Sequence, residues 1–179
     1  MLFTYTSTSK ITFPGGGLAA LGASKNNIEL IKNQMSAQTI GPNKINQLRH
    51  IRYFKNLDGV KAHMKLHAAL LRPRFAAVLE ALETIRDLGI AVWTEPKGGY
   101  FVSVDLTDGC AKRTIQLLKD AGVKMTPAGA TFPYGIDPRD RNIRIAPSYP
   151  PVEELRTAMK MFCLCVKIAA SEKLLEKLS

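Results

Sequence analysis

The spacing of hydrophobic residues predicts a short strand, a loop and two helices in the first third of the chain. Apolar and β-branched residues favour a strand at 2–6, followed by a small-residue loop that ends in Gly15-Gly16-Gly17. Apolar residues then recur at helical spacing after Ser24, a good N-cap, and again over 45–54. The segment Gly41-Pro42-Asn43 separates these two predicted helices.

The longest predicted helix starts at Asp58, which we expect to cap it, and keeps a helical period up to Gly89. Pro73 lies inside this stretch and should kink the helix or split it in two, because proline lacks the N–H that a helix needs. A long helix bent in the middle would connect two domains. The domain organisation predicted in this way is 1–55, a bridging helix at 56–73, and 74–179.

Beyond Gly89 the pattern changes to a mixture of strands and helices. Residues 100–106 alternate between apolar and polar, which is typical of a strand with one buried face. Three prolines predict a long irregular loop at 127–141. The other elements expected here are strands at 90–93, 123–126 and 142–147 and helices at 110–121 and 151–178. Mixed strands and helices indicate an α/β fold.

The composition is that of a globular protein, with 46% hydrophobic and 22% charged residues among 179. This balance argues against a disordered or collagen-like chain. No apolar run is long enough to cross a bilayer, and the first residues lack the pattern of a signal peptide, so we expect no membrane partner. Three cysteines cannot form a closed disulfide framework, which favours a reducing cytoplasmic location.

The net charge of +10 raises the question of an anionic partner. The excess is concentrated in two separate regions, with seven basic and two acidic residues in 1–60 and seven against three in 110–151. Neither region forms a basic block or a stripe interleaved with aromatic residues, so we expect no specific nucleic-acid partner. A small anion, such as a phosphate or a carboxylate, fits this distribution better.

The loop Ser7-Thr8-Ser9-Lys10 before the glycine run carries the candidate chemistry. A lysine flanked by hydroxyls suits a Schiff base to a phosphorylated aldehyde cofactor, provided that its amine can lose a proton. The hydroxyls and nearby backbone N–H groups can bind the phosphate. From spacing alone, a solvated loop lysine is the alternative. The glycines do not match a Rossmann fingerprint.

This loop and three later segments together resemble the fold-type I aminotransferases that use pyridoxal 5'-phosphate. The loop Ser7-Thr8-Ser9-Lys10-Ile11-Thr12-Phe13 is similar to the cofactor-lysine motif of the bacterial aspartate aminotransferase subgroup described as MocR-like. The later segments that agree are 40–50 (IGPNKINQLRH), 96–101 (PKGGYF) and 142–148 (NIRIAPS). The resemblance covers essentially the whole chain.

The resemblance implies a role for four residues. Lys10 would bond the pyridoxal phosphate aldehyde and later move a proton between the substrate Cα and the cofactor, while Ser7 and Ser9 would bind the cofactor phosphate. Arg144 would bind the substrate α-carboxylate as a bidentate pair. In a strand, Arg144 points away from Ile143 and Ile145, which suits that role, although a surface arginine would show the same pattern. The substrates implied are small amino acids and 2-oxo acids, aspartate and 2-oxoglutarate above all.

Two departures from the family pattern are visible. Many members have a phosphate-binding arginine eight residues after the lysine, and here that position is Leu18. In the family, the acid that pairs with the pyridinium nitrogen lies upstream of the lysine, and only nine residues precede Lys10. We therefore expect the C-terminal part of the architecture: the end of the cofactor-binding large domain (1–55), the bridging helix (56–73) and the small α+β domain (74–179). We expect the parent to be a homodimer and the chain alone to be inactive.

Several alternatives remain at this stage. The chain could belong to a different fold-type I enzyme, to the non-catalytic effector domain of a MocR-type regulator, or to a lobe retained for structural reasons. His63 and His67 are four residues apart, as a metal site requires, but no third ligand has suitable spacing, so we predict no metal. The mixed-charge run 137–141 is interpreted as a solvated loop that could border a substrate entrance.

Overall fold

The computed structural model of the chain describes residues 2–178. It divides into two compact units between Ala69 and Leu70, inside one long helix. We describe each unit by itself.

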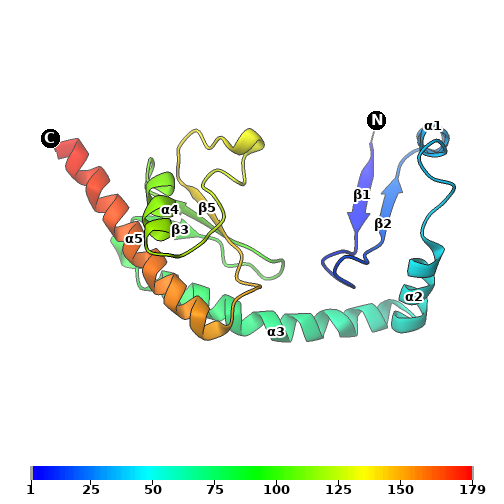
Figure 1. Cartoon of the computed structure of the whole chain (residues 1–179), viewed down its shortest axis with the longest axis horizontal. Helices are drawn as coiled ribbons and strands as arrows, with labels where there is room; N and C mark the ends of the chain where they lie inside the picture. The colour runs from blue at the N-terminus through cyan, green and yellow to red at the C-terminus, as the bar shows by residue number, and fades with distance from the viewer. Residues whose placement is uncertain (1, 179) are drawn as a thin grey trace. The chain divides into compact units, whose positions relative to one another are not determined.

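The first unit begins with an antiparallel hairpin (Figure 1). Strand β1 (Thr4–Ser7) pairs with β2 (Ala19–Gly22), and Ser7 lies opposite Ala19. The strand predicted at 2–6 is confirmed with a small shift in its bounds. The sequence analysis did not predict β2, because four residues of small and apolar type are too few to show an alternation. The hairpin places the predicted lysine loop between its two strands.

Two helices lie between the hairpin and the long helix. Helix α1 (Lys25–Met35) follows Ser24 as predicted, although the Ser24 side chain makes no capping hydrogen bond. Helix α2 (Lys44–Phe54) starts after Asn43, whose side chain accepts a hydrogen bond from the backbone N–H of Asn46 at 3.0 Å. The apolar contacts of this unit centre on one group of aromatic rings, namely Phe13, His50, Tyr53, Phe54 and His63.

Helix α3 (Leu57–Glu83) differs from the prediction at both ends. Asp58 lies within its first turn, and the residue that caps it is Asn56, whose side chain accepts from the N–H of Gly59 at 3.0 Å. The helix ends at Glu83 instead of Gly89 and is followed by the short 3-10 turn η1 (Arg86–Leu88). The apolar spacing continues past the end of the helix because Ile85, between the helix and this turn, is also fully buried.

Pro73 does not split α3, contrary to one of the two predicted outcomes. An internal proline costs about 3 kcal/mol, since one backbone hydrogen bond is lost and the ring crowds the preceding turn. Shortly after Pro73, the helix buries Ala77, Val78 and Leu82 in the core of the second unit. Full burial of one Val or Leu side chain contributes about 1.5–3 kcal/mol, so this packing is sufficient to hold the helix continuous.

The second unit contains a three-stranded antiparallel sheet in the order β3-β4-β5. Its strands are β3 (Ala91–Trp93), β4 (Val102–Leu106) and β5 (Asn142–Ile145), and Arg144 lies opposite Ser103. The strand predicted at 123–126 is wrong. There the backbone leaves helix α4 (Ala111–Asp120) through Gly122, at φ 81°, and the N–H of Val123 caps the helix by donating to Leu118 O at 2.8 Å.

Among the described residues, helices pack on the apolar face of this sheet. The second half of α3, helix α4 and the last helix, α5 (Val152–Leu178), pack on it around a single core (Figure 1). The largest fully buried side chains include Val78, Leu82, Val102, Val104, Leu118, Ile143, Met159 and Phe162. Alternation along β4 and β5 therefore directs Ser103, Asp105, Asn142 and Arg144 to the other face. The predicted mixed α/β fold is confirmed.

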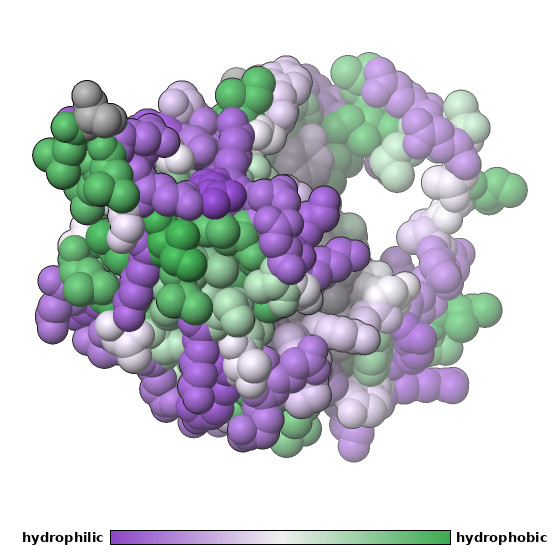
Figure 2. Space-filling view, turned by 60° about the vertical axis from the view of Figure 1, so that its left-hand side comes forward, coloured by the Kyte–Doolittle hydropathy of each residue, from purple (hydrophilic) through white to green (hydrophobic). Residues whose placement is uncertain are grey.

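The surface of the second unit is mixed in character. Figure 2 shows apolar side chains among hydrophilic ones on the face that carries α5. Among the residues that the structure describes, no helix combines the length and the apolar character needed to span a membrane.

Candidate active site

The lysine loop brings together Ser7, Ser9 and Lys10, the three residues predicted at one site. Ser7 is the last residue of β1, and its Oγ lies 2.9 Å from Ser9 Oγ. The backbone N–H of Ser9 also donates to Ser7 Oγ at 3.2 Å. All three side chains are exposed. The loop therefore presents two adjacent hydroxyls and one amine to a ligand.

Hydrogen bonds close the loop at its base. The N–H of Thr8 donates to Leu18 O at 2.8 Å, and the N–H of Leu18 donates to Thr8 Oγ1 at the same distance. The N–H groups of Ile11 and Thr12 both donate to Thr8 O, at 2.9 and 2.8 Å, so Lys10 lies within a helix-like turn. Leu18, where the family resemblance would place an arginine, contributes its backbone to this closure.

One of the three glycines, Gly17, is required by a close approach to backbone, whereas the atoms closest to Gly16 belong to the flexible end of the Arg49 side chain. A Cβ on Gly17 would lie 2.5 Å from Ser9 Oγ and 2.7 Å from Ser9 N, and a Cβ on Gly16 would lie 2.0 Å from a nitrogen of Arg49. Any side chain at Gly17 would displace the backbone of Ser9, so the glycine run lets the loop fold against itself.

Helix α2 holds the glycine run from outside, a contact that the sequence analysis missed. The side-chain amide of Asn46 donates to Gly16 O at 3.0 Å and to Gly17 O at 3.2 Å. Arg49 donates to Asn46 Oδ1 at 2.8 Å, and its guanidinium carbon lies 4.7 Å from the ring centroid of Phe13. Both residues belong to the 40–50 motif, but no spacing rule connects that motif with the loop.

Arg144 lies in the other unit, on the polar face of the sheet. Its guanidinium carbon is 4.4 Å from the ring centroid of Phe101, which precedes β4. Its Nε is buried and has no hydrogen-bond partner among the described residues. A guanidinium that rests on a ring and retains an unsatisfied donor is suited to bind a carboxylate.

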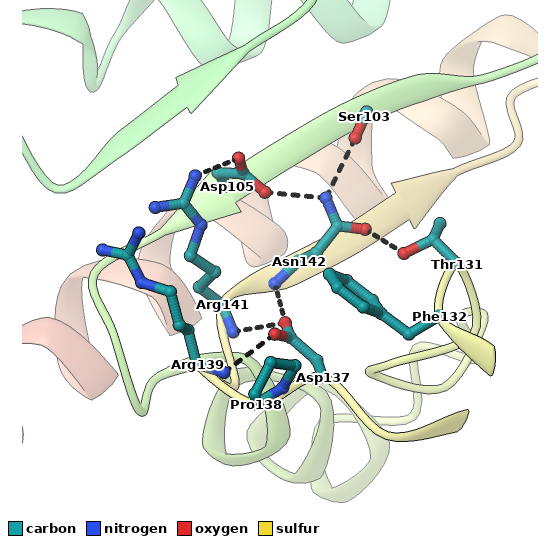
Figure 3. A pocket seen from close by; sticks show the side chains of 9 residues that line it. All are labelled: Ser103, Asp105, Thr131, Phe132, Asp137, Pro138, Arg139, Arg141 and Asn142. Atoms are coloured by element: carbon teal, nitrogen blue, oxygen red, sulfur yellow. Dashed lines mark hydrogen bonds and ion pairs between the residues drawn. The ribbon is translucent and has the colours of Figure 1, made fainter. Parts of the chain in front are cut away.

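A polar cavity of about 450 Å³ lies on this same face of the sheet (Figure 3). Ser103, the strand partner of Arg144, is among its lining residues. Asn142 occupies its centre and donates to Ser103 Oγ at 3.0 Å and to Asp105 Oδ1 at 2.7 Å. Arg141 pairs with the other oxygen of Asp105. The cavity wall is thus a connected set of hydrogen bonds.

The predicted solvated loop at 137–141 is wrong for Asp137, which is only 8% exposed, whereas Arg139 is exposed and Asp140 and Arg141 are half-buried. Its carboxylate accepts backbone N–H groups of Arg139 at 3.0 Å and of Arg141 and Asn142 at 2.8 Å each. Burial alone would raise the pKa of the Asp137 carboxyl, but these donors hold the pKa below its usual range. Asp137 therefore fixes the start of β5, the strand that carries Arg144.

The histidine pair on α3 participates in ring packing. The ring centroids of His63 and His67 are 4.3 Å apart, and His63 Nε2 lies 3.2 Å from the carbonyl oxygen of Thr12. Within the described part of the chain, no group of three or more His, Cys, Asp or Glu side chains could hold a metal.

Comparison with known proteins identifies the family. A family model described as aspartate amino-transferase matches residues 2–178. The chain belongs to this family. A Mycolicibacterium smegmatis protein assigned as an aminotransferase is 50% identical over 172 residues, which cover 96% of this chain and 40% of that protein.

In two comparisons the other protein is named for aspartate. An aspartate aminotransferase from Corynebacterium glutamicum is 46% identical over 171 residues, covering 95% of this aminotransferase chain and 40% of that protein. A crystal structure of an aspartate transaminase from the same organism superposes with a TM-score of 0.92 at 46% identity, covering 96% of this chain and 41% of the other. The chain thus spans about two fifths of the length of the relatives it matches.

The lysine loop fits the cofactor that the aminotransferase family implies. Kynurenine aminotransferase from Pyrococcus horikoshii, 26% identical with a TM-score of 0.76, was solved in complex with PMP, and the match covers 92% of this chain and 40% of that one. In the present chain, the paired hydroxyls of Ser7 and Ser9 suit a phosphate, and the amine of Lys10, the next residue in the sequence, suits an aldehyde.

Proposed function

We propose that this chain is the C-terminal part of a pyridoxal-phosphate-dependent aspartate aminotransferase, which transfers an amino group between aspartate and 2-oxoglutarate. The observation that carries the proposal is the pairing of Ser7 and Ser9 hydroxyls, 2.9 Å apart, in the same closed loop as Lys10. Aspartate is supported by the names of a relative and of a solved structure from Corynebacterium glutamicum, each 46% identical to this chain.

Each candidate residue then has a defined task. Ser7 and Ser9 bind the cofactor phosphate through their hydroxyls, and Lys10 holds the cofactor through its amine. When bound, pyridoxal phosphate supplies an electron sink for the substrate Cα. The amine of Lys10 would take the proton from the substrate Cα, which requires the amine to be neutral. The backbone N–H groups of the glycine run are candidates for the phosphate contact that an arginine at Leu18 would otherwise provide.

Arg144 binds the α-carboxylate of the substrate in this proposal. The planar guanidinium offers two parallel donors to a carboxylate, and the ring of Phe101 limits its rotation. The unsatisfied Nε supports this role, because a buried donor without a partner costs about 1–3 kcal/mol until a ligand accepts from it.

The remaining proposals concern the whole protein. We propose membership of the MocR-like subgroup, on the four motifs described above, and a homodimeric parent located in the cytoplasm. The exposed apolar residues Ile45 and Ile51 of α2, at 84% and 65% exposure, support coverage of this helix in the parent. Three cysteines without disulfides support a reducing location. The comparisons give no support to the alternative of a regulator's effector domain.

An absorbance titration tests the assignment of Lys10. Mixing the chain with pyridoxal phosphate should shift the absorbance of the cofactor as it bonds to an amine, and Lys10→Ala should remove this shift. Lys25→Ala, which removes an exposed lysine of α1 in the same unit, is the matched control and should leave the shift unchanged. A shift that survives Lys10→Ala would remove this lysine from its proposed role.

A further inference from the structure

We propose that His50 is a positioning residue for Lys10, acting through the hydroxyl of Thr12. This inference rests on the function proposed above, because it assigns a role toward the cofactor lysine. The histidine lies on α2 and the threonine two residues after Lys10, and His50 Nε2 is 2.9 Å from Thr12 Oγ1. Both residues are buried, at 6% and 3% exposure.

The other ring nitrogen of His50 fixes the polarity of this contact. Nδ1 lies 2.8 Å from the carbonyl oxygen of Asn46, one helical turn earlier, so its N–H donates there. In the neutral ring, Nε2 then carries no proton and is an acceptor for the single hydroxyl proton of Thr12, for which Thr8 O and Thr8 Oγ1 are the competing acceptors. The backbone of α2 thereby orients an acceptor toward the lysine loop.

Thr12 connects this acceptor with the turn that contains Lys10. Its Oγ1 lies 3.1 Å from Thr8 O and 3.0 Å from Thr8 Oγ1, and its N–H donates to Thr8 O. Thr8 Oγ1 in turn accepts from the N–H of Leu18. In the sequence, Lys10 therefore lies between two threonines that are held to each other, to Leu18 next to β2 and to His50 of α2.

Aromatic rings surround the contact between His50 and Thr12, so water cannot easily take the place of either partner. The ring of His50 packs against Phe13 and Phe54, with centroids 5.0 and 5.8 Å apart. His63 also approaches the carbonyl of Thr12 at 3.2 Å. A polar contact in such surroundings is costly to break, because each partner left alone remains desolvated.

The consequence for Lys10 is that its side chain starts from a fixed backbone. The four bonds of a lysine stem give its amine many positions, and each additional backbone state multiplies them. Fixing the turn at Thr8 and Thr12 removes the backbone states. His50 thus raises the fraction of time during which the amine faces the hydroxyls of Ser7 and Ser9.

Hydrogen exchange of the chain without cofactor tests the connection itself. Thr12→Val and His50→Phe should each speed exchange of the Leu18 and Thr12 amides by about tenfold, the effect of losing one hydrogen bond of ordinary strength. Thr12→Ser, which keeps the hydroxyl, and His50→Gln, which keeps an acceptor near the Nε2 position, should restore most of the protection. Amides of α5 are the internal reference. Unchanged exchange in Thr12→Val would overturn the proposal.

Reductive trapping tests the consequence for Lys10. The chain is incubated with pyridoxal phosphate, reduced with borohydride and digested, and mass spectrometry gives the share of label on Lys10 relative to Lys25 and Lys44. Thr12→Val should lower the Lys10 share severalfold and Thr12→Ser should not. An equal share in both variants would overturn the positioning role. Absence of label from Lys10 in the unaltered chain would instead reject the proposed function. The hydrogen-exchange experiment does not depend on that function, because it is done without cofactor.

Discussion

At the scale of single residues, Asp137 shows how a buried charge can organise backbone. Its two oxygens accept three backbone N–H groups from the residues that lead into β5. Hydrogen bonds to a charged acceptor are about twice as strong as neutral ones. The carboxylate therefore stabilises this loop by accepting from three N–H groups that would otherwise need water as their partner.

Asp137→Asn should destabilise the second unit by about 1–3 kcal/mol at neutral pH, because an amide oxygen is a weaker acceptor and its NH₂ group opposes the backbone donors. The pKa of Asp137 is lowered in the fold, so its contribution is present above the unfolded pKa of about 3.9 and is lost as the pH falls further. Urea unfolding at several pH values checks this.

The matched control for that substitution is Asp87→Asn, an exposed carboxylate on η1, which should change stability by less than about 0.5 kcal/mol. The difference between the unaltered chain and Asp137→Asn should narrow below pH 4. A difference that stays constant into acid would show that the charge of Asp137 is not what stabilises the loop.

At the scale of elements, α3 lacks one backbone hydrogen-bond donor in its middle. Pro73 has no N–H for the carbonyl of Ala69, and the division between the two compact units falls directly after Ala69. The next carbonyl, that of Leu70, accepts a side-chain hydrogen bond from Arg74 at 2.6 Å. The weakest turn of the helix thus coincides with the border between the units.

Replacing Pro73 with alanine should strengthen this turn. The new N–H can donate to the Ala69 carbonyl, and the unfolding free energy should rise by about 1–2 kcal/mol after allowance for the freer unfolded chain. Hydrogen exchange of amides at 70–76 should slow accordingly. Pro96→Ala, in the turn between β3 and β4, is the control and should not affect these amides. Faster exchange in Pro73→Ala would show that the ring stabilises the helix as it stands.

The elements that the sequence predicted well are those with a long apolar period or a clear alternation. Helix α5 and strand β4 are examples, since burial on one face repeats along each of them. Predictions failed where a local hydrogen bond decides the outcome. Asn56 caps α3 in place of Asp58, and Gly122 turns the chain where a strand was expected.

The candidate site was predictable only in part. The motif identified Lys10, Ser7 and Ser9, but the support from Arg49 and His50 depends on long-range packing that spacing does not encode.

At the scale of the whole molecule, the two units differ in how much core they contain. The second unit buries a continuous set of large side chains at 0–2% exposure, whereas the described residues of the first bury only Thr12, His50 and Phe54. Its helices α1 and α2 expose apolar residues such as Leu30, at 58%. A unit with so little buried apolar area has little to offset its conformational entropy.

We therefore expect the two units to unfold separately. Amides of β4, β5 and α5 should exchange at least about a hundredfold more slowly than amides of α1, since protection follows the stability of the local cooperative unit. Native-state exchange at neutral pH checks this. The variant Phe162→Ala, which empties the core of the second unit, should remove most of that difference, at a cost of about 3–5 kcal/mol. Equal protection in both units of a monomer would contradict the expectation.

The pleat of β5 has a consequence for fidelity of folding. Ile143 and Ile145 are at most 2% exposed, and Arg144 lies between them. A slip of one residue in the pairing with β4 would expose both isoleucines, at about 1.5–3 kcal/mol each, and would bury a guanidinium. The shifted pairing is thus less stable than the native one even when no ligand is bound. Because Ile143 and Ile145 point into the core, Arg144 must point to the opposite face of the sheet. Its donors are therefore available to a carboxylate.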